Sequence, residues 1–405
     1  MIASGTVGSG PAQLNAPAEF RLLCLALRPR PSPADAEALR RALAAAPDWS
    51  RLLAGARRHM VEPLLLAGLR AAGISEVPPD VMAELQQRST AAARRTLAQI
   101  VELELLSRTF AQREIRFLVL KGVALSAQLY GDPARRGGRD IDLLIDPDRF
   151  ADADAVLAGA HYSRRIATPS ARQSLEYRRH IKDVEYIHAV TRAHIELHDR
   201  LTDNVHLLAC DFDELWRERE TVPVGGMAMR TLSRRRMALY LLAHGASHAW
   251  ERLRWLIDLA ELLHAPGAVD AALEAAEPVG LAPAMLHALA LAHAWLGLDV
   301  AERHLARARA SARVRRLDRM LAPLYAGDAW CEQPSRGSWR GMARYSVWAR
   351  LYRFSLKSDW RYRTAQARRE WFTPVDWGTL PLPDAWFWLY PFLRPAGWLV
   401  RRLRR

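Results

Sequence analysis

Residues 120–145 read LKGVALSAQLYGDPARRGGRDIDLLI, and the period of the apolar residues changes within this stretch. An aliphatic run ends at a Lys-Gly corner, a helix-like segment follows, and two aspartates then alternate with aliphatic residues. Because successive strand residues point to opposite faces, the alternation at 140–145 indicates a strand. The stretch therefore predicts a strand–helix–strand unit, whose polar ends are either incidental or built to hold metal ions and phosphates.

The segments on either side of this unit differ from it in period. Residues 19–112 carry apolar residues at three- and four-residue spacing, with a break at Pro78-Pro79, which is typical of helices. Further strands are predicted at 115–120, 182–189 and 194–201, the last two joined as a hairpin, and a second hairpin is predicted around Gly225-Gly226. Helical spacing then returns. The sequence therefore predicts an α+β fold, in which a small mixed β-sheet core lies between an N-terminal helical domain and a C-terminal helical lobe.

The chain of 405 residues is long enough for several domains. We expect five parts: a disordered lead-in (1–18), a helical domain (19–112), the sheet core (113–232), a helical lobe (233–324) and a basic segment (325–405). The net charge is +14, and the last segment holds fifteen Lys and Arg against six Asp and Glu, with nine of the fourteen tryptophans. The basicity therefore belongs largely to that segment.

The cysteines and the apolar runs bear on the compartment. Cys24, Cys210 and Cys331 match no metal knuckle or disulfide framework, which indicates a reducing environment. The first seventeen residues lack the basic start and apolar block of a secretory signal. The apolar run at 385–393 has nine residues, far below the roughly 20 that span a bilayer. We expect a cytoplasmic protein with no transmembrane helix.

Three acids form the first candidate constellation. Asp140 and Asp142 lie two residues apart on a predicted strand, so their carboxylates share a face, with Cα atoms roughly 6.5 Å apart. Paired carboxylates repel unless cations lie between them, and hard divalent ions such as Mg²⁺ or Mn²⁺ meet that need. Glu196, flanked by two aliphatic residues in HIELH, is expected to complete the set from a neighbouring strand.

The Lys-Gly corner forms the second constellation. Gly122 ends a strand and opens a helix, where free N–H groups and the helix dipole favour an anion. A residue without a Cβ also lets a phosphate approach the backbone. Lys121 and Arg139, on either side of the acidic pair, are expected to neutralise phosphates.

Two pairs of histidines allow more than one interpretation. His194 and His198 flank Glu196 as H-x-E-x-H, which fits either a zinc site or, as we favour, orientation of Glu196 or contact with the substrate. His244 and His248 lie one helical turn apart, but Gly245 replaces the glutamate of a metalloprotease motif. They belong either to a packing face or to the substrate side of a helical lobe.

The order of strand, Gly corner, helix, Arg-D-x-D strand and later strand with a central Glu resembles the DNA-polymerase-β-like nucleotidyltransferase superfamily. More narrowly, LVLKGVAL, RDIDLLI, IELH and HGASHAWERLRWLIDLAELL are similar to a bacterial, mostly uncharacterised nucleotidyltransferase family that carries Lys-Gly at this corner. The resemblance extends from the helical leader to about His264. The broad superfamily has a small residue after the glycine, where this chain has Val123.

The resemblance implies which residues act. Residues 113–232 would form the catalytic core, Asp140, Asp142 and Glu196 would hold Mg²⁺ or Mn²⁺, and Gly122 would lie under the phosphates of an NTP. The implied reaction moves a nucleoside monophosphate to an acceptor that the sequence does not identify. Members of the family often accompany surface-polysaccharide or peptide-modification pathways.

Two alternatives share the same fold. One is a non-catalytic binding or scaffold protein acting at a membrane surface or polyanion. The other is a toxin–antitoxin enzyme that modifies a protein or tRNA. The complete acidic set favours an enzyme over the scaffold, because a degenerate member is expected to lose at least one acid.

The basic C-terminal segment has three interpretations. Its tryptophans pack onto the body while its arginines stay solvated, or it binds an anionic membrane at the inner face, or it binds nucleic acid. Trp386, Trp388 and the terminal arginines favour the membrane over nucleic acid.

Overall fold

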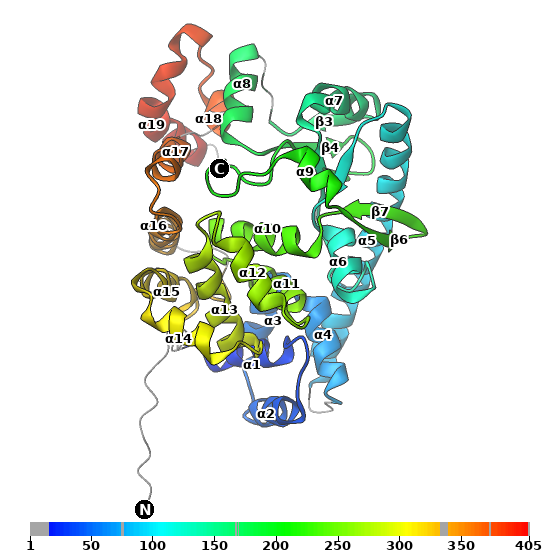
Figure 1. Cartoon of the computed structure of the whole chain (residues 1–405), viewed down its shortest axis with the longest axis vertical. Coiled ribbons are helices and arrows are strands. Elements are labelled where there is room, and N and C mark those ends of the chain that lie inside the picture. The colour runs from blue at the N-terminus through cyan, green and yellow to red at the C-terminus, as the bar shows by residue number, and fades with distance from the viewer. Residues whose placement is uncertain are drawn as a thin grey trace, which may run out of the picture. The chain divides into compact units, whose positions relative to one another are not determined.

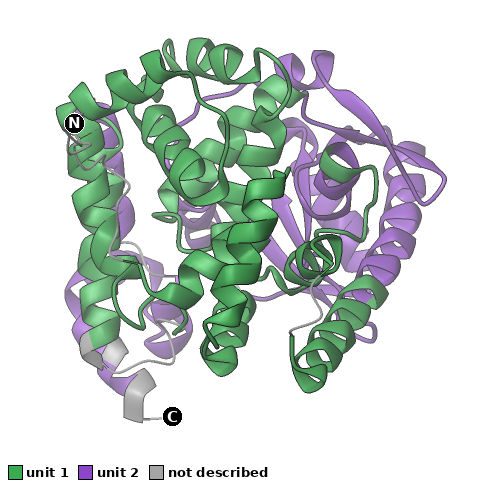
Figure 2. Cartoon of the chain, turned by 90° about the horizontal axis from the view of Figure 1, so that it is seen from below, with its two compact units in different colours: residues 1–94, 129–137, 234–357 green, residues 95–128, 138–233, 358–405 purple. Residues whose placement is uncertain are grey.

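The structure, a computed structural model, describes residues 16–73, 77–166, 168, 170–332, 339–371 and 374–403. Most of the expected disordered lead-in, residues 1–15, lies outside the described residues. The chain divides into two compact units (Figure 2). Unit 1 comprises Met1–Arg94, Leu129–Gly137 and Arg234–Lys357, and unit 2 comprises Arg95–Gln128, Gly138–Ser233 and Ser358–Arg405.

Unit 1 is built from helices, as the three- and four-residue spacing predicts. Its helices are α1 (Ala18–Ala26), α2 (Pro33–Ala44), α3 (Trp49–His59), α4 (Glu62–Ala71), the first part of α5 (Pro79–Gln112), α10 (Arg234–Ser247), α11 (Leu253–Leu263), α12 (Ala268–Ala276), α13 (Ala282–Leu296), α14 (Glu302–Ala310), α15 (Ala312–Tyr325) and α16 (Trp339–Ser355). Local signals start several of them. Ser32 and Asp35 form a capping box at α2, for example. The predicted helical domain and helical lobe are therefore confirmed as helical.

Aromatic side chains from distant segments form the centre of unit 1. The ring of Phe20 meets those of Trp295 and Tyr325 edge-on, with centroids 5.2 and 5.3 Å apart. In α10, a Cβ at Gly245 would overlap the indole ring of Trp250. The glycine that breaks the metalloprotease motif is therefore explained by close packing of this ring against the helix.

Unit 2 contains a five-stranded mixed sheet with the order β1-β2-β5-β4-β3. Two of its strands, β3 and β4, are labelled in Figure 1. The strands are β1 (Phe117–Val119), β2 (Ile141–Ile145), β3 (Tyr162–Arg164), β4 (Asp183–His188) and β5 (His194–His198). β2 and β5 run parallel, and every other neighbouring pair is antiparallel. A separate hairpin joins β6 (Glu220–Val224) to β7 (Met227–Thr231). The mixed sheet and both predicted hairpins are confirmed.

One face of this sheet is apolar because every second residue of its central strands is apolar and points to that face. Leu143, Leu197 and Val184 lie side by side on β2, β5 and β4 and belong to the core of unit 2. Side chains of α5 and α7 (Phe150–Gly159) join the same core, among them Phe110 and Leu157. The intervening residues of the strands therefore point to the opposite face, where the charged side chains gather.

Further helices of unit 2 lie between its strands or in its C-terminal stretch. They are α6 (Gly122–Tyr130), α8 (Ala171–His180), α9 (Phe212–Arg217), α17 (Trp360–Trp371), α18 (Val375–Thr379) and α19 (Tyr390–Leu403), with short 3₁₀ turns η1 (Pro147–Arg149) and η2 (Asp384–Leu389). Trp377 and Tyr390 of the basic segment are buried in the core of this unit. Among the described residues, every helix falls short of the length and apolarity that crossing a bilayer needs.

Candidate active site

The register of three strands brings a row of charged side chains together on the polar face of the sheet. Asp142 of β2 lies opposite Glu196 of β5, and Glu196 lies opposite Glu185 of β4. One alternation further along, His198 lies opposite Asp183. Because residues two apart on a strand share a face, all five side chains belong to the same side of the sheet.

Three of these residues could hold a metal ion. Asp142, Glu196 and His198 each offer one ligand atom, and the three atoms lie within 4.8 Å of one another. Nε2 of His198 is 3.2 Å from Oδ1 of Asp142 and 3.5 Å from Oε2 of Glu196. Two carboxylates and an imidazole at this spacing form a donor set that fits a divalent ion.

The charges around Asp142 keep it ionised although it is buried. Its side chain is 1% exposed, and burial alone would favour the neutral acid. Lys121, whose Nζ lies 2.9 Å from Oδ1, and the hydrogen bond with His198 instead hold the pKa of Asp142 well below its usual range. The carboxylate is therefore available as a charged ligand at neutral pH.

The pKa of Glu196 is shifted in the opposite direction. Burial and the neighbouring charge of Asp142 raise its pKa above the usual value, although His198, Lys121 and Lys182 partly offset this rise. Two adjacent acids whose pKa values move apart are a common feature of functional sites, because one carboxylate makes ionisation of the other costly. A cation between them would relieve that repulsion.

The Gly corner borders this cluster. Gly122 is the first residue of α6 and has a φ of +60°, in the left-handed region that favours glycine. A Cβ added at Gly138 would come within 3.5 Å of the Cα of Gly122, so the two backbones approach closely. Arg139, the next residue, is exposed. The helix N-terminus, Lys121 and the acids thus meet in one part of unit 2.

Comparison with known proteins identifies the family. The family described as uncharacterised nucleotidyltransferase matches residues 45–297, which is more than half of the chain. The chain belongs to this family. No curated protein and no solved structure matches the chain.

The structure places the three predicted acids differently relative to the three-residue group, and their roles in nucleotidyl transfer stay predictions. Asp142 and Glu196 lie in the three-residue group, and His198 is its third member. Asp140 precedes β2 instead of opening it and is half-buried. The hydrogen bond with Glu185 raises the pKa of His194 against the effect of burial, and the charge of Asp140 adds to this rise. Asp140 therefore acts electrostatically on His194, beside the group.

The zinc interpretation of H-x-E-x-H receives little support from the histidines. Nε2 of His194 lies 3.2 Å from Oε2 of Glu185, and His194 is outside the three-residue group. A zinc-bound imidazole usually donates its other N–H to a carboxylate or carbonyl. Nδ1 of His198 is buried and, within the described part of the chain, has no hydrogen-bond partner. The geometry favours orientation of both carboxylates by Nε2.

Sequence reasoning missed the charged residues of β4 and Lys182, which directly precedes this strand. Lys182 is paired with Asp183, whose Oδ1 lies 2.5 Å from Nζ, and Glu185 borders Glu196. The hydrogen bond with His194 and the charge of Arg165 lower the pKa of Glu185 to about 2. A second alternation, D-V-E at 183–185, was the signal that could have revealed them.

His244 and His248 belong to unit 1 and pack together at the end of α10. Their ring centroids are 4.8 Å apart, and both rings contact Trp255, at 4.9 and 5.0 Å. Asp258 pairs with Arg136 at 2.7 Å. The packing interpretation accounts for these contacts, and a role on the substrate side stays a prediction.

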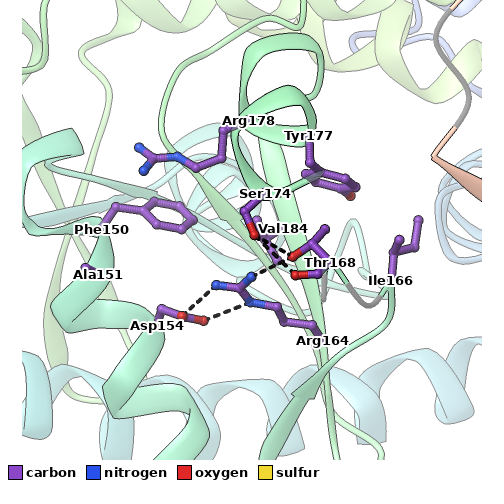
Figure 3. Close-up of a pocket in the computed structure, with 10 residues that line it drawn as sticks. All are labelled: Phe150, Ala151, Asp154, Arg164, Ile166, Thr168, Ser174, Tyr177, Arg178 and Val184. Carbon is purple, nitrogen blue, oxygen red and sulfur yellow. Dashed lines mark hydrogen bonds and ion pairs between the residues drawn. The ribbon is translucent and has the colours of Figure 1, made fainter. Parts of the chain in front are cut away.

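A pocket of about 170 Å³ is lined by side chains from α7, β3, α8 and β4 (Figure 3). Val184, which lines it, points away from the side on which Asp183 and Glu185 lie. Within it, Arg164 pairs with Asp154 at 2.6 Å and donates to Thr168. Ser174 also donates to Thr168, whereas Arg178 pairs with Asp199 outside the lining. The pocket is separate from the acidic cluster.

Proposed function

We propose that this protein transfers a nucleoside monophosphate from an NTP to an acceptor, with Mg²⁺ or Mn²⁺ held by Asp142 and Glu196. The observation that carries the proposal is the convergence of these two acids and His198 within 4.8 Å, in a chain of a nucleotidyltransferase family. Asp140 is proposed to border the metal site. The acceptor belongs to a surface-polysaccharide or peptide-modification pathway in this proposal.

The chain's own groups account for the other needs of the reaction. The N–H groups at the Gly122 corner, Lys121 and Arg139 neutralise the triphosphate. His198 orients both carboxylates through Nε2. A bound divalent ion would supply charge stabilisation for the phosphoryl group and a more acidic acceptor.

The bonds exchanged are those of phosphoryl transfer. An acceptor oxygen forms a bond to the α-phosphorus of the NTP, and the bond from that phosphorus to the bridging oxygen of pyrophosphate breaks. The acceptor loses its proton, and pyrophosphate leaves with the electron pair of the broken bond. We favour this reaction over the non-catalytic scaffold because the chain has both acids beside an intact Gly corner.

The reaction can be tested with NTPs labelled at the α-phosphate. Each NTP is incubated with Mg²⁺ and pools of small molecules, RNA or protein, and transfer of label is measured. We expect wild type to label one acceptor class, and Asp142→Asn to reduce transfer by about 100-fold or more through loss of a ligand.

The matched control is Asp148→Asn, the same change at an exposed position just beyond β2. It is expected to retain wild-type transfer. Equal transfer by wild type and Asp142→Asn would contradict the proposed site. Labelling of protein or tRNA would favour the toxin–antitoxin alternative over a small-molecule pathway.

A further inference from the structure

Asp142 already has a cation of the chain's own beside it. Nζ of Lys121 lies 2.9 Å from Oδ1, the same oxygen that Nε2 of His198 approaches to 3.2 Å. The lysine side chain is 11% exposed and the carboxylate 1% exposed. A buried carboxylate needs such a partner, because an unpaired charge away from water is strongly unfavourable.

The choice of lysine here is unusual for this chain. Only three of its fifty-eight Lys and Arg residues are lysines, namely Lys121, Lys182 and Lys357. Two of the three contact acids on the polar face of the sheet, Asp142 and Asp183. An ammonium is a compact charge on a flexible stem, whereas a guanidinium is a planar fork suited to fixed, bidentate pairing. Asp142 is therefore paired with a flexible ammonium, although the usual cation of this arginine-rich chain is the planar guanidinium.

A divalent ion on Asp142 and the ammonium on the same carboxylate would repel each other. The site is largely buried, so water screens this repulsion poorly. The neighbouring residue offers the ammonium another partner, because Gly122 opens α6 where the proposed nucleotide phosphates lie.

We infer that Lys121 is an exchangeable counter-ion. It neutralises Asp142 while no divalent ion is bound, gives up that carboxylate when one binds, and turns to the phosphates of the nucleotide. The inference rests on the proposed function. It adds a positioning role in which metal and nucleotide binding are coupled through one side chain.

Binding of Mn²⁺ without nucleotide tests the competition. Free Mn²⁺ is measured by electron paramagnetic resonance with wild type, Lys121→Met and Lys182→Met. We expect Lys121→Met to bind Mn²⁺ about tenfold more tightly, because the competing ammonium is gone. Lys182→Met removes an equal charge that pairs with Asp183 and reaches Glu196 only through its electrostatic field, so it is expected to tighten binding less than Lys121→Met does.

Wild-type protein provides a second measurement that needs no variant. With three lysines in the chain, acylation by a mild anhydride can be followed residue by residue in mass spectra. Mg²⁺ alone should increase the labelling rate of Lys121 several-fold relative to Lys182, and Mg²⁺ with a non-hydrolysable NTP should decrease it again.

Three outcomes would overturn the inference. Equal tightening in both variants would show a general charge effect. Binding of Mn²⁺ with no change at Lys121 in either measurement would show a fixed structural ion pair, and the proposed nucleotidyl transfer would stand. Failure of both wild type and Lys121→Met to bind Mn²⁺ would remove the metal site, and the proposed function with it.

Discussion

Asp142 is the residue on which the proposed function depends. It is buried, it accepts contacts from Lys121 and His198, and its pKa is held low although burial opposes its ionisation. Buried ion pairs contribute little to stability compared with well-packed apolar side chains. Stability is thus a weak reason for an acid at this position, whereas a ligand role gives a direct one.

His59 of unit 1 leads to a prediction about how the stability of the protein depends on pH. The residue is fully buried, and its Nδ1 accepts the N–H of Leu253 at 3.0 Å. Burial and the charge of Arg58 lower its pKa well below the usual value. The unfolded chain takes up a proton near pH 6.5 and the folded chain does not, so stability should fall as the pH drops below that value.

The expected loss is at most about 1.4 kcal/mol per pH unit for this one group. Urea unfolding of wild type at about pH 7.5 and about pH 5.5 measures it, and His59→Gln, which keeps an acceptor but cannot be protonated, should show a smaller dependence. The same pH dependence in both proteins would show that other groups determine it.

At the scale of elements, the alternation in DIDLLI and HIELH predicted which side chains share a face, and the structure confirms that Asp142 and Glu196 do. Alternation does not say which strands are neighbours, because the partner of a strand is set by the whole core. β4 carries the same alternation in D-V-E at 183–185, but its charged side chains were not assigned to the site. β3 has three residues and α8 is mostly polar, so neither gave a periodic signal.

The segment from η2 to α19 carries an unusual apolar surface. Trp386, Trp388 and Phe392 are 58, 62 and 73% exposed, while Tyr390 between them is buried in the core of unit 2. Interfacial Trp beside arginines is typical of peripheral membrane contact. The exposure of these side chains fits the sequence-based expectation of contact with an anionic membrane, which remains a prediction.

Vesicle sedimentation tests this contact. Wild type should sediment with vesicles rich in phosphatidylglycerol and not with phosphatidylcholine alone. Trp386→Ser with Trp388→Ser should weaken binding about tenfold or more, since each side chain loses its apolar transfer energy. Leu175→Ser, at a position 68% exposed on α8, is the control. Equal binding by the control and the double variant would argue against this surface.

For the molecule as a whole, the family match at 45–297 includes helices of unit 1 and the entire sheet of unit 2. The fold class could be predicted from changes in apolar period along the chain. The division into two units could not, because each unit is assembled from three separate stretches. Nine of the fourteen surplus positive charges belong to the basic C-terminal segment, so the net charge alone does not identify the substrate of the sheet core.

Calorimetric titration of the whole protein with each NTP, in the presence and absence of Mg²⁺, tests the central claim most directly. We predict saturable binding of at least one NTP that requires Mg²⁺ and is lost in Asp142→Asn but retained in Asp148→Asn. Binding of no NTP in the presence of Mg²⁺, or equal binding by wild type and Asp142→Asn, would contradict the account.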